Sequence, residues 1–248
     1  MTFSTPPATK NELLTALPPE AFSRLLPHLR PVSLVTRETL IRPDSPIEAV
    51  WFVESGWVSL VATMEDGAQA EVGLIGREGM VGLPLIIGID TAFSEAFVQA
   101  NGAALQMDAG AFRHAMNEEP ALRDRMFRYL EAMIAQTTQT AACNGHHELE
   151  QRLARWLLMA HDRAEGDELE MTQEFLALML CVYRPGVSIV AAMFQRAGMI
   201  RYGRGHITVL DRPALEATAC ACYQTVKQRF ERLLGPGSAP DAVSLDAA

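Results

Sequence analysis

One stretch near the carboxyl end, TQEFLALMLCVYRPGVSIVAAMFQRAGMIRYGRGHITVLD, constrains the fold of this chain more than any other. Two short segments within it carry apolar residues at helical spacing, separated by a turn at Cys181 and Val182. A hairpin then follows, with Arg204 at its tip between two glycines. This layout predicts a helix-turn-helix followed by a β-wing. The expected inward residues are Phe175, Leu176, Met179 and Leu180 in the first helix and Val187, Val190, Ala191 and Phe194 in the second.

The second of these helices opens on Pro185 and Gly186, two residues that disfavour a helix interior. In the first turn, however, the N–H groups have no intrahelical partner, so a proline costs little there. The residue before a proline prefers an extended backbone, so we expect the helix to begin at Pro185. Thr172 is the expected N-cap of the first helix, with the acidic Glu174 in its first turn.

Charge is unevenly distributed along the chain. The net charge of −9 over 248 residues argues against a polyanionic partner for the protein as a whole. Residues 1–120 hold 7 basic and 15 acidic side chains, whereas residues 172–212 hold five arginines against two acidic residues. A basic island of this kind is compatible with phosphate binding at one face.

The segment from about residue 31 to 107 has the sequence pattern of a β domain. Short apolar runs alternate with turn signals, and we expect a hairpin at Ser55-Gly56 and a turn at Asp66-Gly67. FSEAFVQANG and AALQMD are expected to form two further short strands with a turn between them. The pattern predicts an antiparallel double-sheet barrel or jelly roll.

Helix formers dominate from Asp108 onward. We expect one helix of about 22 residues, ~33 Å long, which Asn-Gly ends within CNGHH (143–147). A second helix follows, with Trp156 in its core face. The apolar stripe of the long helix exceeds what a small barrel needs, which favours contact with a second copy of the chain. The alternative is that the stripe packs on its own barrel. The predicted contact residues are Leu122, Met126, Tyr129, Met133, Gln136 and Thr140, with Leu130, Ile134, Thr137 and Ala141 on the flank.

Together these segments predict an α+β protein. We expect a jelly-roll sensor barrel over residues 1–117, a dimerisation helix and hinge over 118–145 and a winged helix-turn-helix over 146–234. The small, polar segment 235–248 is expected to be disordered.

Three segments in this order resemble the Crp/Fnr family of bacterial transcription regulators: HELEQRLARWLL, TQEFLALML and RAGMIRYGRGHITVLD. The resemblance extends over about residues 12–232. It implies a homodimer without enzymatic activity that binds a palindromic double-stranded DNA site, with RNA polymerase as a further partner. It also implies that the second helix lies in the major groove, where an arginine in its first turn, here Arg184, reads base edges.

The implied DNA contacts fall into two groups. Arg184 can make a two-pronged contact with guanine, while Ser188 and Ile189 on the same side can hydrogen-bond and touch a thymine methyl group. Pro185 and Gly186 stand where relatives often carry a glutamate and a threonine, so the reading surface is altered. Tyr183 either contacts phosphate or packs under the turn. The other expected phosphate contacts are Thr172, Gln173, Arg201, Arg204 and His206.

The barrel departs from the cyclic-nucleotide pattern of the family. Leu83 stands at the position of the glutamate that meets the ribose, and residues 79–112 contain no lysine or arginine to neutralise a phosphate. We therefore expect no bound cyclic nucleotide and an effector of another kind, or none. An iron–sulfur cluster is not expected either, because no cysteine precedes Cys143. Haem remains open.

No metal site is predicted. The four cysteines, Cys143, Cys181, Cys220 and Cys222, are few and scattered, which is typical of free thiols in a reducing compartment. Cys220 and Cys222 lie two apart in a segment expected to be helical, where their side chains would diverge. His146-His147 is expected to cap or solvate a helix end.

Two other functions remain as alternatives. A metal enzyme of the cupin kind needs histidines on barrel strands, and residues 31–107 contain none. A protein-interaction module whose winged helix has lost specific DNA binding is the second alternative. The amino-terminal segment lacks a basic run followed by an apolar core, and VGLPLIIGI is too short to cross a bilayer. These features favour the cytoplasm and no membrane partner.

Overall fold

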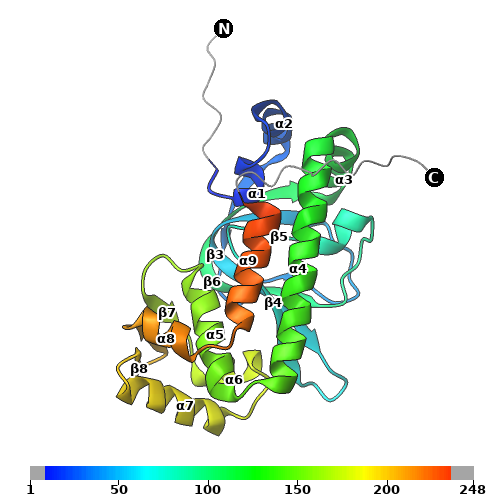
Figure 1. Cartoon of the computed structure of the whole chain (residues 1–248). Coiled ribbons are helices and arrows are strands. Elements are labelled where there is room, and N and C mark those ends of the chain that lie inside the picture. The colour runs from blue at the N-terminus through cyan, green and yellow to red at the C-terminus, as the bar shows by residue number, and fades with distance from the viewer. Residues whose placement is uncertain (1–8, 236–248) are drawn as a thin grey trace, which may run out of the picture.

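The computed structural model describes residues 9–235, so the predicted disordered tail lies outside the described residues apart from Gly235. Its architecture is the predicted α+β one, with an antiparallel barrel, a long helix beside it and a helical part with a small sheet at the opposite end (Figure 1). The long helix α4 runs along almost the whole length of the molecule, from the barrel to the helical carboxyl-terminal part.

Two short helices and a 3-10 turn precede the barrel: α1 (Glu12–Thr15), α2 (Pro19–Leu25) and η1 (Leu26–His28). Asn11 fixes this entry segment. Its side-chain oxygen caps α1, and its buried amide donates to the carbonyls of Val53 and Gly79, both at 2.8 Å. A satisfied buried amide of this kind ties the start of the described chain to one barrel strand, at Val53, and to the loop that precedes another, at Gly79.

Six antiparallel strands form the barrel, and they pair in the order β1-β6-β3-β4, with β2 on β6 and β5 on β3. A short 3-10 segment, η2 (Leu83–Ile87), follows β5. The strands are β1 (Arg30–Leu34), β2 (Thr39–Ile41), β3 (Ala49–Thr63), β4 (Gln69–Ile75), β5 (Met80–Val81) and β6 (Glu95–Asp108).

The hairpin predicted at Ser55-Gly56 is wrong. β3 continues through this point, and β6 likewise continues where two strands were expected. The register between β3 and β6 shifts on both sides of Ser55, so the glycine sits in a bulge. Gly56 has φ 70°, and a Cβ there would lie 2.5 Å from the Ala100 carbonyl oxygen. The turn predicted at Asp66-Gly67 is confirmed, since it joins β3 to β4.

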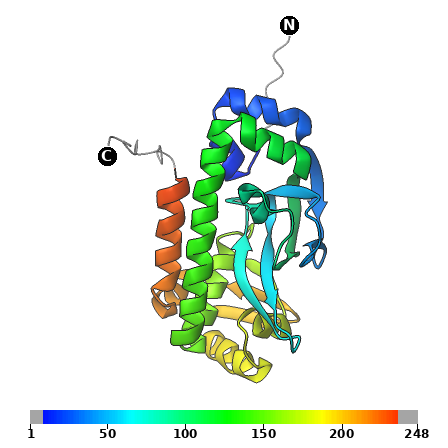
Figure 2. The ribbon, with the colours of Figure 1, turned by 90° about the vertical axis from the view of Figure 1, so that its right-hand side faces the viewer.

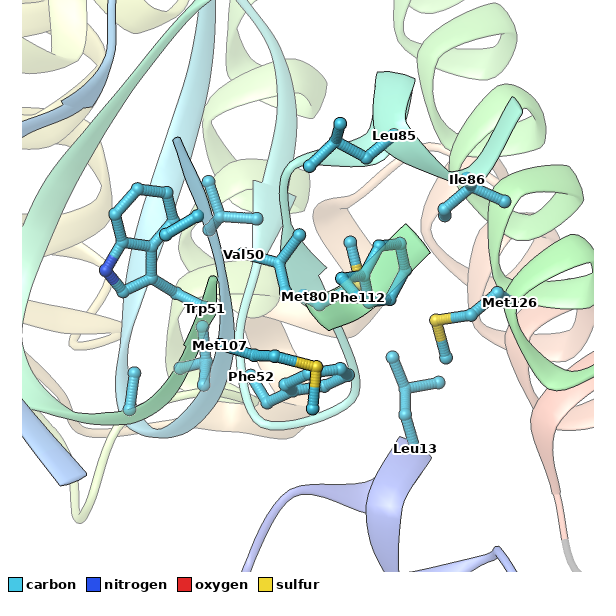
Figure 3. Close-up of a cluster of buried hydrophobic side chains, with 14 of the residues drawn as sticks. Leu13, Val50, Trp51, Phe52, Met80, Leu85, Ile86, Met107, Phe112 and Met126 are labelled. Atoms are coloured by element: carbon cyan, nitrogen blue, oxygen red, sulfur yellow. The ribbon is translucent and has the colours of Figure 1, made fainter. Parts of the chain in front are cut away.

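The barrel core is filled by aliphatic, aromatic and sulfur-containing side chains from the strands and the adjoining helices (Figure 3). The Phe52 and Phe112 rings lie 6.4 Å apart at a tilt of 55°. Met107 of β6 and Met126 of α4 are buried in the same cluster. This single core joins the strands to α3 (Ala109–Glu118) and to the first half of α4.

α4 (Pro120–His146) has 27 residues and is longer than predicted. The helix does not end at Asn144-Gly145 but passes through both residues. A glycine inside a helix costs about 1 kcal/mol, which the packing of α4 along its length can offset. The chain leaves the helix at His147, and α5 (Leu149–His161) begins two residues later.

The stripe of α4 predicted to meet a second chain instead faces the chain's own barrel, so that prediction is wrong. Tyr129 donates a hydrogen bond from its hydroxyl to the Met80 carbonyl at 3.0 Å. Gln136 exchanges hydrogen bonds with the backbone of Leu74 in β4. Thr140 faces α5 and accepts a hydrogen bond from Arg155 at 2.9 Å. The residues of this stripe that are buried in the single chain are Leu122, Met126, Tyr129, Met133 and Gln136.

The carboxyl-terminal part combines helices with a three-stranded antiparallel sheet of order β7-β9-β8. The sheet contains the predicted wing plus one additional strand from the segment before the helix-turn-helix. Its elements after α5 are β7 (Glu168–Glu170), α6 (Gln173–Met179), α7 (Arg184–Arg196), β8 (Ile200–Gly203), β9 (His206–Val209), α8 (Arg212–Thr218) and α9 (Cys222–Leu234).

A buried seam joins this part to the barrel. Trp57 and Leu74 of the barrel belong to the same apolar cluster as Trp156 of α5, which confirms Trp156 as a core residue. The Trp156 indole N–H donates to Glu71 of β4 at 2.8 Å, and Phe97 of β6 meets Phe175 of α6 edge to face at 5.8 Å. Burial raises the pKa of Glu71 to about 7, because the interior disfavours its charged form.

The last helix, α9, lies alongside α4 on a side that the barrel leaves free (Figure 2). Arg229 of α9 forms an ion pair with Glu131 of α4. Near the other end, the Arg125 guanidinium donates to the Leu234 carbonyl at 2.6 Å. α4 is therefore covered on two sides within one chain.

Within residues 9–235, no single helix has the length and apolar content needed to cross a bilayer. α6 and α7 meet that test only when they are taken together, and they are bent relative to each other by 111°.

Candidate nucleic-acid interface

α6 and α7 form the predicted helix-turn-helix, and their axes differ in direction by 111°. Thr172 caps α6, since its hydroxyl accepts the Phe175 N–H at 3.2 Å. Between the helices, Cys181 adopts φ 50°, and the Val182 N–H donates to the Ala177 carbonyl at 2.9 Å. This left-handed residue reverses the chain within three residues, as a helix C-terminus commonly does.

The inner face of α7 is formed by the predicted residues Val187, Val190, Ala191 and Phe194, which are all buried. They belong to the apolar cluster that also holds Leu176 and Met179 of α6. This packing fixes the rotation of α7, so the opposite side of the helix is presented to solvent.

The geometry of the first turn of α7 explains why Pro185 and Gly186 are tolerated there. The helix begins at Arg184, one residue earlier than predicted, and Pro185 occupies the first turn where its missing N–H is not needed. Gly186 faces α5, and a Cβ at this position would lie 3.0 Å from Leu149 Cδ2. The glycine therefore allows the start of α7 to approach α5 closely.

Arg184 lies at the exposed amino-terminal end of α7 and forms an ion pair with a residue of α6. Its Nη1 atom is 2.8 Å from Glu174 Oε1, and both side chains are about 60% exposed. An exposed pair of this kind is weak, so a stronger acceptor can displace the carboxylate. The guanidinium therefore lies at the exposed start of α7, beside the first turn of α6.

The other predicted base-facing residues share this surface. The Ser188 hydroxyl donates to Gln173 Oε1 at 2.6 Å, which places the start of α6 beside α7. Ile189 is 64% exposed although it is apolar. Tyr183 is 91% exposed, so it does not pack under the turn.

The wing lies against the start of α6. The Met171 N–H donates to the Gly205 carbonyl at 2.6 Å. Arg204 at the tip has φ 52°, and Arg201 is exposed on β8. His206 Nδ1 lies 2.9 Å from Glu168 of β7, so a phosphate would compete with a carboxylate for this side chain. The nine predicted DNA contacts thus occupy adjoining parts of one surface, on α6, α7 and the wing.

Comparison with known proteins agrees with this geometry. Residues 151–218 match the Crp-like helix-turn-helix domain, and residues 31–119 match the cyclic nucleotide-binding domain. The chain belongs to the Crp/Fnr family of transcription regulators. A Crp-like regulator has a helix-turn-helix DNA-binding domain, and the family is not one of enzymes.

Curated relatives of this Crp/Fnr protein include two from Mycobacterium tuberculosis (strain CDC 1551 / Oshkosh). The CRP-like cAMP-activated global transcriptional regulator is 24% identical over 208 residues, which cover 81% of this chain and 93% of that protein. The HTH-type transcriptional regulator Cmr is 27% identical over 179 residues, which cover 71% and 70% of the two chains.

Among solved structures, FixK2 from Bradyrhizobium japonicum superposes with a TM-score of 0.67 at 16% identity, over 78% of this chain and 98% of that chain. A putative Crp/Fnr regulator from Eubacterium rectale gives 0.65 at 17% identity, over 83% and 96%. These likenesses show the fold.

The barrel segment from β5 through η2 to β6 contains Gly82 and Leu83. Gly82 has φ 113° and precedes Leu83, the first residue of η2. Glu95, at the start of β6, accepts a hydrogen bond from Thr39 at 2.9 Å. A separate cavity of about 1200 Å³ lies between α1, α4 and α9, with Arg77 and Lys227 in its lining.

Two features of this surface do not follow from the sequence pattern. Glu174 is expected as a first-turn acid of α6, and the structure adds its ion pair with Arg184 at the start of α7. The close approach of Gly186 to Leu149 depends on which helix crosses the start of α7, which no local pattern in the sequence shows.

Proposed function

We propose that this protein is a sequence-specific DNA-binding regulator that acts on transcription, with RNA polymerase as a further partner, and that it reads DNA through α7. The observation that carries the proposal is the exposed start of α7, where Arg184 and Ile189 are largely open to solvent beside Ser188, on a face bordered by the first turn of α6. A guanidinium in this place suits the major-groove edge of guanine. Arg201, Arg204 and the start of α6 supply phosphate contacts around it.

We further propose a homodimer, formed through a different stripe of α4 from the one that the sequence suggested. Phe127 and Ile134 are exposed on the side of α4 away from α9, seven residues apart. Leu130, Thr137 and Ala141 continue the same face at spacings of three and four. Pairing two copies along this stripe would present two α7 helices to a palindromic site, with half-sites ~34 Å apart.

For the barrel, we propose an effector other than a cyclic nucleotide, or none. One relative is named as cAMP-activated, but residues 79–112 of this chain carry no lysine or arginine. Asp90 and Glu95 are the charged residues of segment 79–107, so this segment offers a phosphate acidic groups and no cation, which is electrostatically unfavourable. Calorimetric titration with cyclic AMP and cyclic GMP should therefore show no binding, and a micromolar dissociation constant for either would contradict this part.

Selection of bound sites from random duplex DNA tests the main proposal. It should return a palindrome, and Arg184→Ala should reduce the preference for that site over scrambled DNA by about 10- to 100-fold. Arg196→Ala is the matched control, because Arg196 is an exposed arginine in the last turn of the same helix. The control should keep the preference. Circular dichroism would confirm that both variants are folded.

The salt dependence of binding separates this function from that of an interaction module. Phosphate contacts release counterions, so affinity for DNA should fall steeply as salt rises. A protein that shows no site preference and no salt-dependent duplex binding would have lost DNA recognition, and the proposal would fail.

A further inference from the structure

A cluster of three cysteines and a histidine lies apart from the DNA-facing surface, at the carboxyl end of α4. Cys143 and His147 belong to that end, and Cys220 and Cys222 lie at the break between α8 and α9. The four ligand atoms all lie within 4.8 Å of one another. The Cys143 and Cys220 sulfurs are 3.5 Å apart, and Cys222 Sγ is 3.6 Å from His147 Nδ1. Two segments separated by 77 residues thus bring four metal-binding atoms together.

This arrangement overturns the expectation that Cys220 and Cys222 diverge. The expectation assumed a continuous helix, but α8 ends at Thr218 and α9 begins at Cys222. Between them, Ala219 has an extended backbone with ψ 149°. The break frees both sulfurs to turn toward α4. On that side, Cys143 and His147 are four residues apart, the spacing that places two side chains on one helix face.

The separations suit one tetrahedral ion. With Zn–S near 2.3 Å and Zn–N near 2.1 Å, neighbouring ligand atoms in a tetrahedron lie about 3.5 to 3.8 Å apart. Two of the six separations in the cluster, 3.5 and 3.6 Å, match that range, and the other four are no longer than 4.8 Å. The three sulfurs are buried and the histidine is half-buried. Four protein ligands leave no open position, which is the pattern of a structural site rather than a catalytic one.

The surroundings suit the charge of such a site. A zinc ion with three thiolates and a neutral histidine carries a net charge of −1. Arg155 of α5 is buried, acts electrostatically on Cys143 and has an Nε atom with no hydrogen-bond partner among residues 9–235. Gln139 Nε2 donates to Cys222 Sγ at 3.0 Å, as the outer partners of metal-bound thiolates do.

We propose that Cys143, His147, Cys220 and Cys222 bind one Zn²⁺ ion. The ion clamps the start of α9 to the end of α4, next to the short connection that leads into α5. It therefore fixes the DNA-binding part relative to the long helix. The thiolate-rich donor set selects a soft or borderline cation such as Zn²⁺ over Mg²⁺ or Ca²⁺.

Metal analysis of the full-length, untagged protein, purified with a reductant and without chelator, is the first test. Plasma mass spectrometry should find about one zinc per chain, and Cys143→Ser and Cys220→Ser should each lower this to less than about a tenth. Cys181→Ser and His146→Ala are matched controls, because Cys181 is the exposed fourth cysteine and His146 is the exposed neighbour of His147. Both controls should keep the zinc.

Cobalt substitution is the second test, and it holds even if a cysteine variant fails to fold. After zinc is removed from the wild-type protein by chelation, Co²⁺ should bind at about one ion per chain. Its spectrum should show thiolate-to-cobalt charge transfer and the ligand-field bands of a tetrahedral site. His147→Ala should shift those bands.

The proposal is overturned if the reduced wild-type protein binds neither zinc nor cobalt. It is equally overturned if zinc survives in a folded Cys143→Ser variant, if Cys181→Ser loses it, or if intact mass shows a Cys143–Cys220 disulfide in protein from reducing cells. None of these measurements involves DNA, so this proposal and the proposed function stand or fall separately.

Discussion

α4 and α7 are both amphipathic helices whose apolar stripes stand out in the sequence, and the two stripes have different outcomes. In α7, the predicted inward residues are buried against α6 and α5, and the predicted outward residues face solvent. In α4, the stripe assigned to a second chain is covered by the chain's own barrel. Periodicity identifies the face of a helix that is buried, but it does not identify the surface that buries it.

α4 differs from α7 because it has three environments around its circumference. One face meets the barrel, a second meets α9, and a third, with Phe127 and Ile134, is exposed. The exposed stripe is less apolar than the barrel-facing one, so hydrophobicity alone ranks the stripe proposed to pair two chains below the one that is buried within a single chain. The predictions below test this difference, the seam between the barrel and the carboxyl-terminal part, and the contact of α6 with the start of α7.

The largest effect is expected from Met126→Ala, on the barrel face of α4. Met126 is fully buried in the barrel core, so its truncation should lower the free energy of unfolding by about 2–5 kcal/mol. Ile134→Ala, on the face where that side chain is 53% exposed, should cost less than about 1 kcal/mol at a protein concentration where the chain is monomeric. Urea denaturation measures both, and equal losses would mean that the two faces are not different.

Glu71→Gln tests the seam that packs α5 and α6 against the barrel. Burial raises the folded-state pKa of Glu71 from 4.5 to about 7, so its favourable contribution is present in full below pH 4.5. That contribution is lost as the pH rises through about 7, because the folded state must then hold a buried charge. Hydrogen bonds from Ser59 and Trp156, and then the charges of Arg163 and Arg155, lower the pKa of Glu71 but do not cancel the effect of burial.

Between pH 5.5 and 8, the free energy of unfolding of the wild-type protein should fall relative to the Gln variant by about 2 kcal/mol. Urea denaturation of both proteins at the two pH values measures the difference. An unchanged difference would mean that Glu71 titrates as it does in the unfolded chain.

Ile134→Glu tests the exposed stripe as the contact between two copies. A charge in the middle of a paired apolar stripe should raise the dimer dissociation constant by at least about tenfold, equivalent to 1.4 kcal/mol. Ala217→Glu, which adds the same charge on the exposed side of α8, should leave the dimer intact. Sedimentation velocity over a concentration series compares them. A dimer that is unaffected by Ile134→Glu would place the interface elsewhere.

The smallest effect is expected from Glu174→Gln. Removing the carboxylate frees Arg184 and removes a negative charge from the DNA-facing surface, so affinity for the selected site should rise by up to about fivefold. Glu118→Gln, which makes the same change on the exposed end of α3, serves as the control. Fluorescence anisotropy with labelled duplex measures both. A loss of affinity would instead mean that Glu174 orients Arg184 for binding.

Much of the local structure followed from the sequence. The helix-turn-helix, the glycine-bracketed wing and the Asp66-Gly67 turn were all predicted, because each rests on interactions within a few residues. The bulge at Ser55-Gly56 was not predicted, because a glycine with positive φ suits a hairpin and a bulge equally well. The pairing of β3 with the distant β6 selected the bulge. Likewise, Asn144-Gly145 is a helix-ending signal that packing overrode.

The sequence by itself determined the order of the parts, the inner face of α7 and the place of Arg184 at its mouth, because helical periodicity and first-turn geometry are local properties. Three contacts were decided only by the tertiary structure. They are the neighbours that cover each side of α4, the approach of Gly186 to Leu149, and the approach of Cys143 to Cys220. These are contacts between segments far apart along the chain. They depend on how whole elements pack, which no short window of sequence encodes.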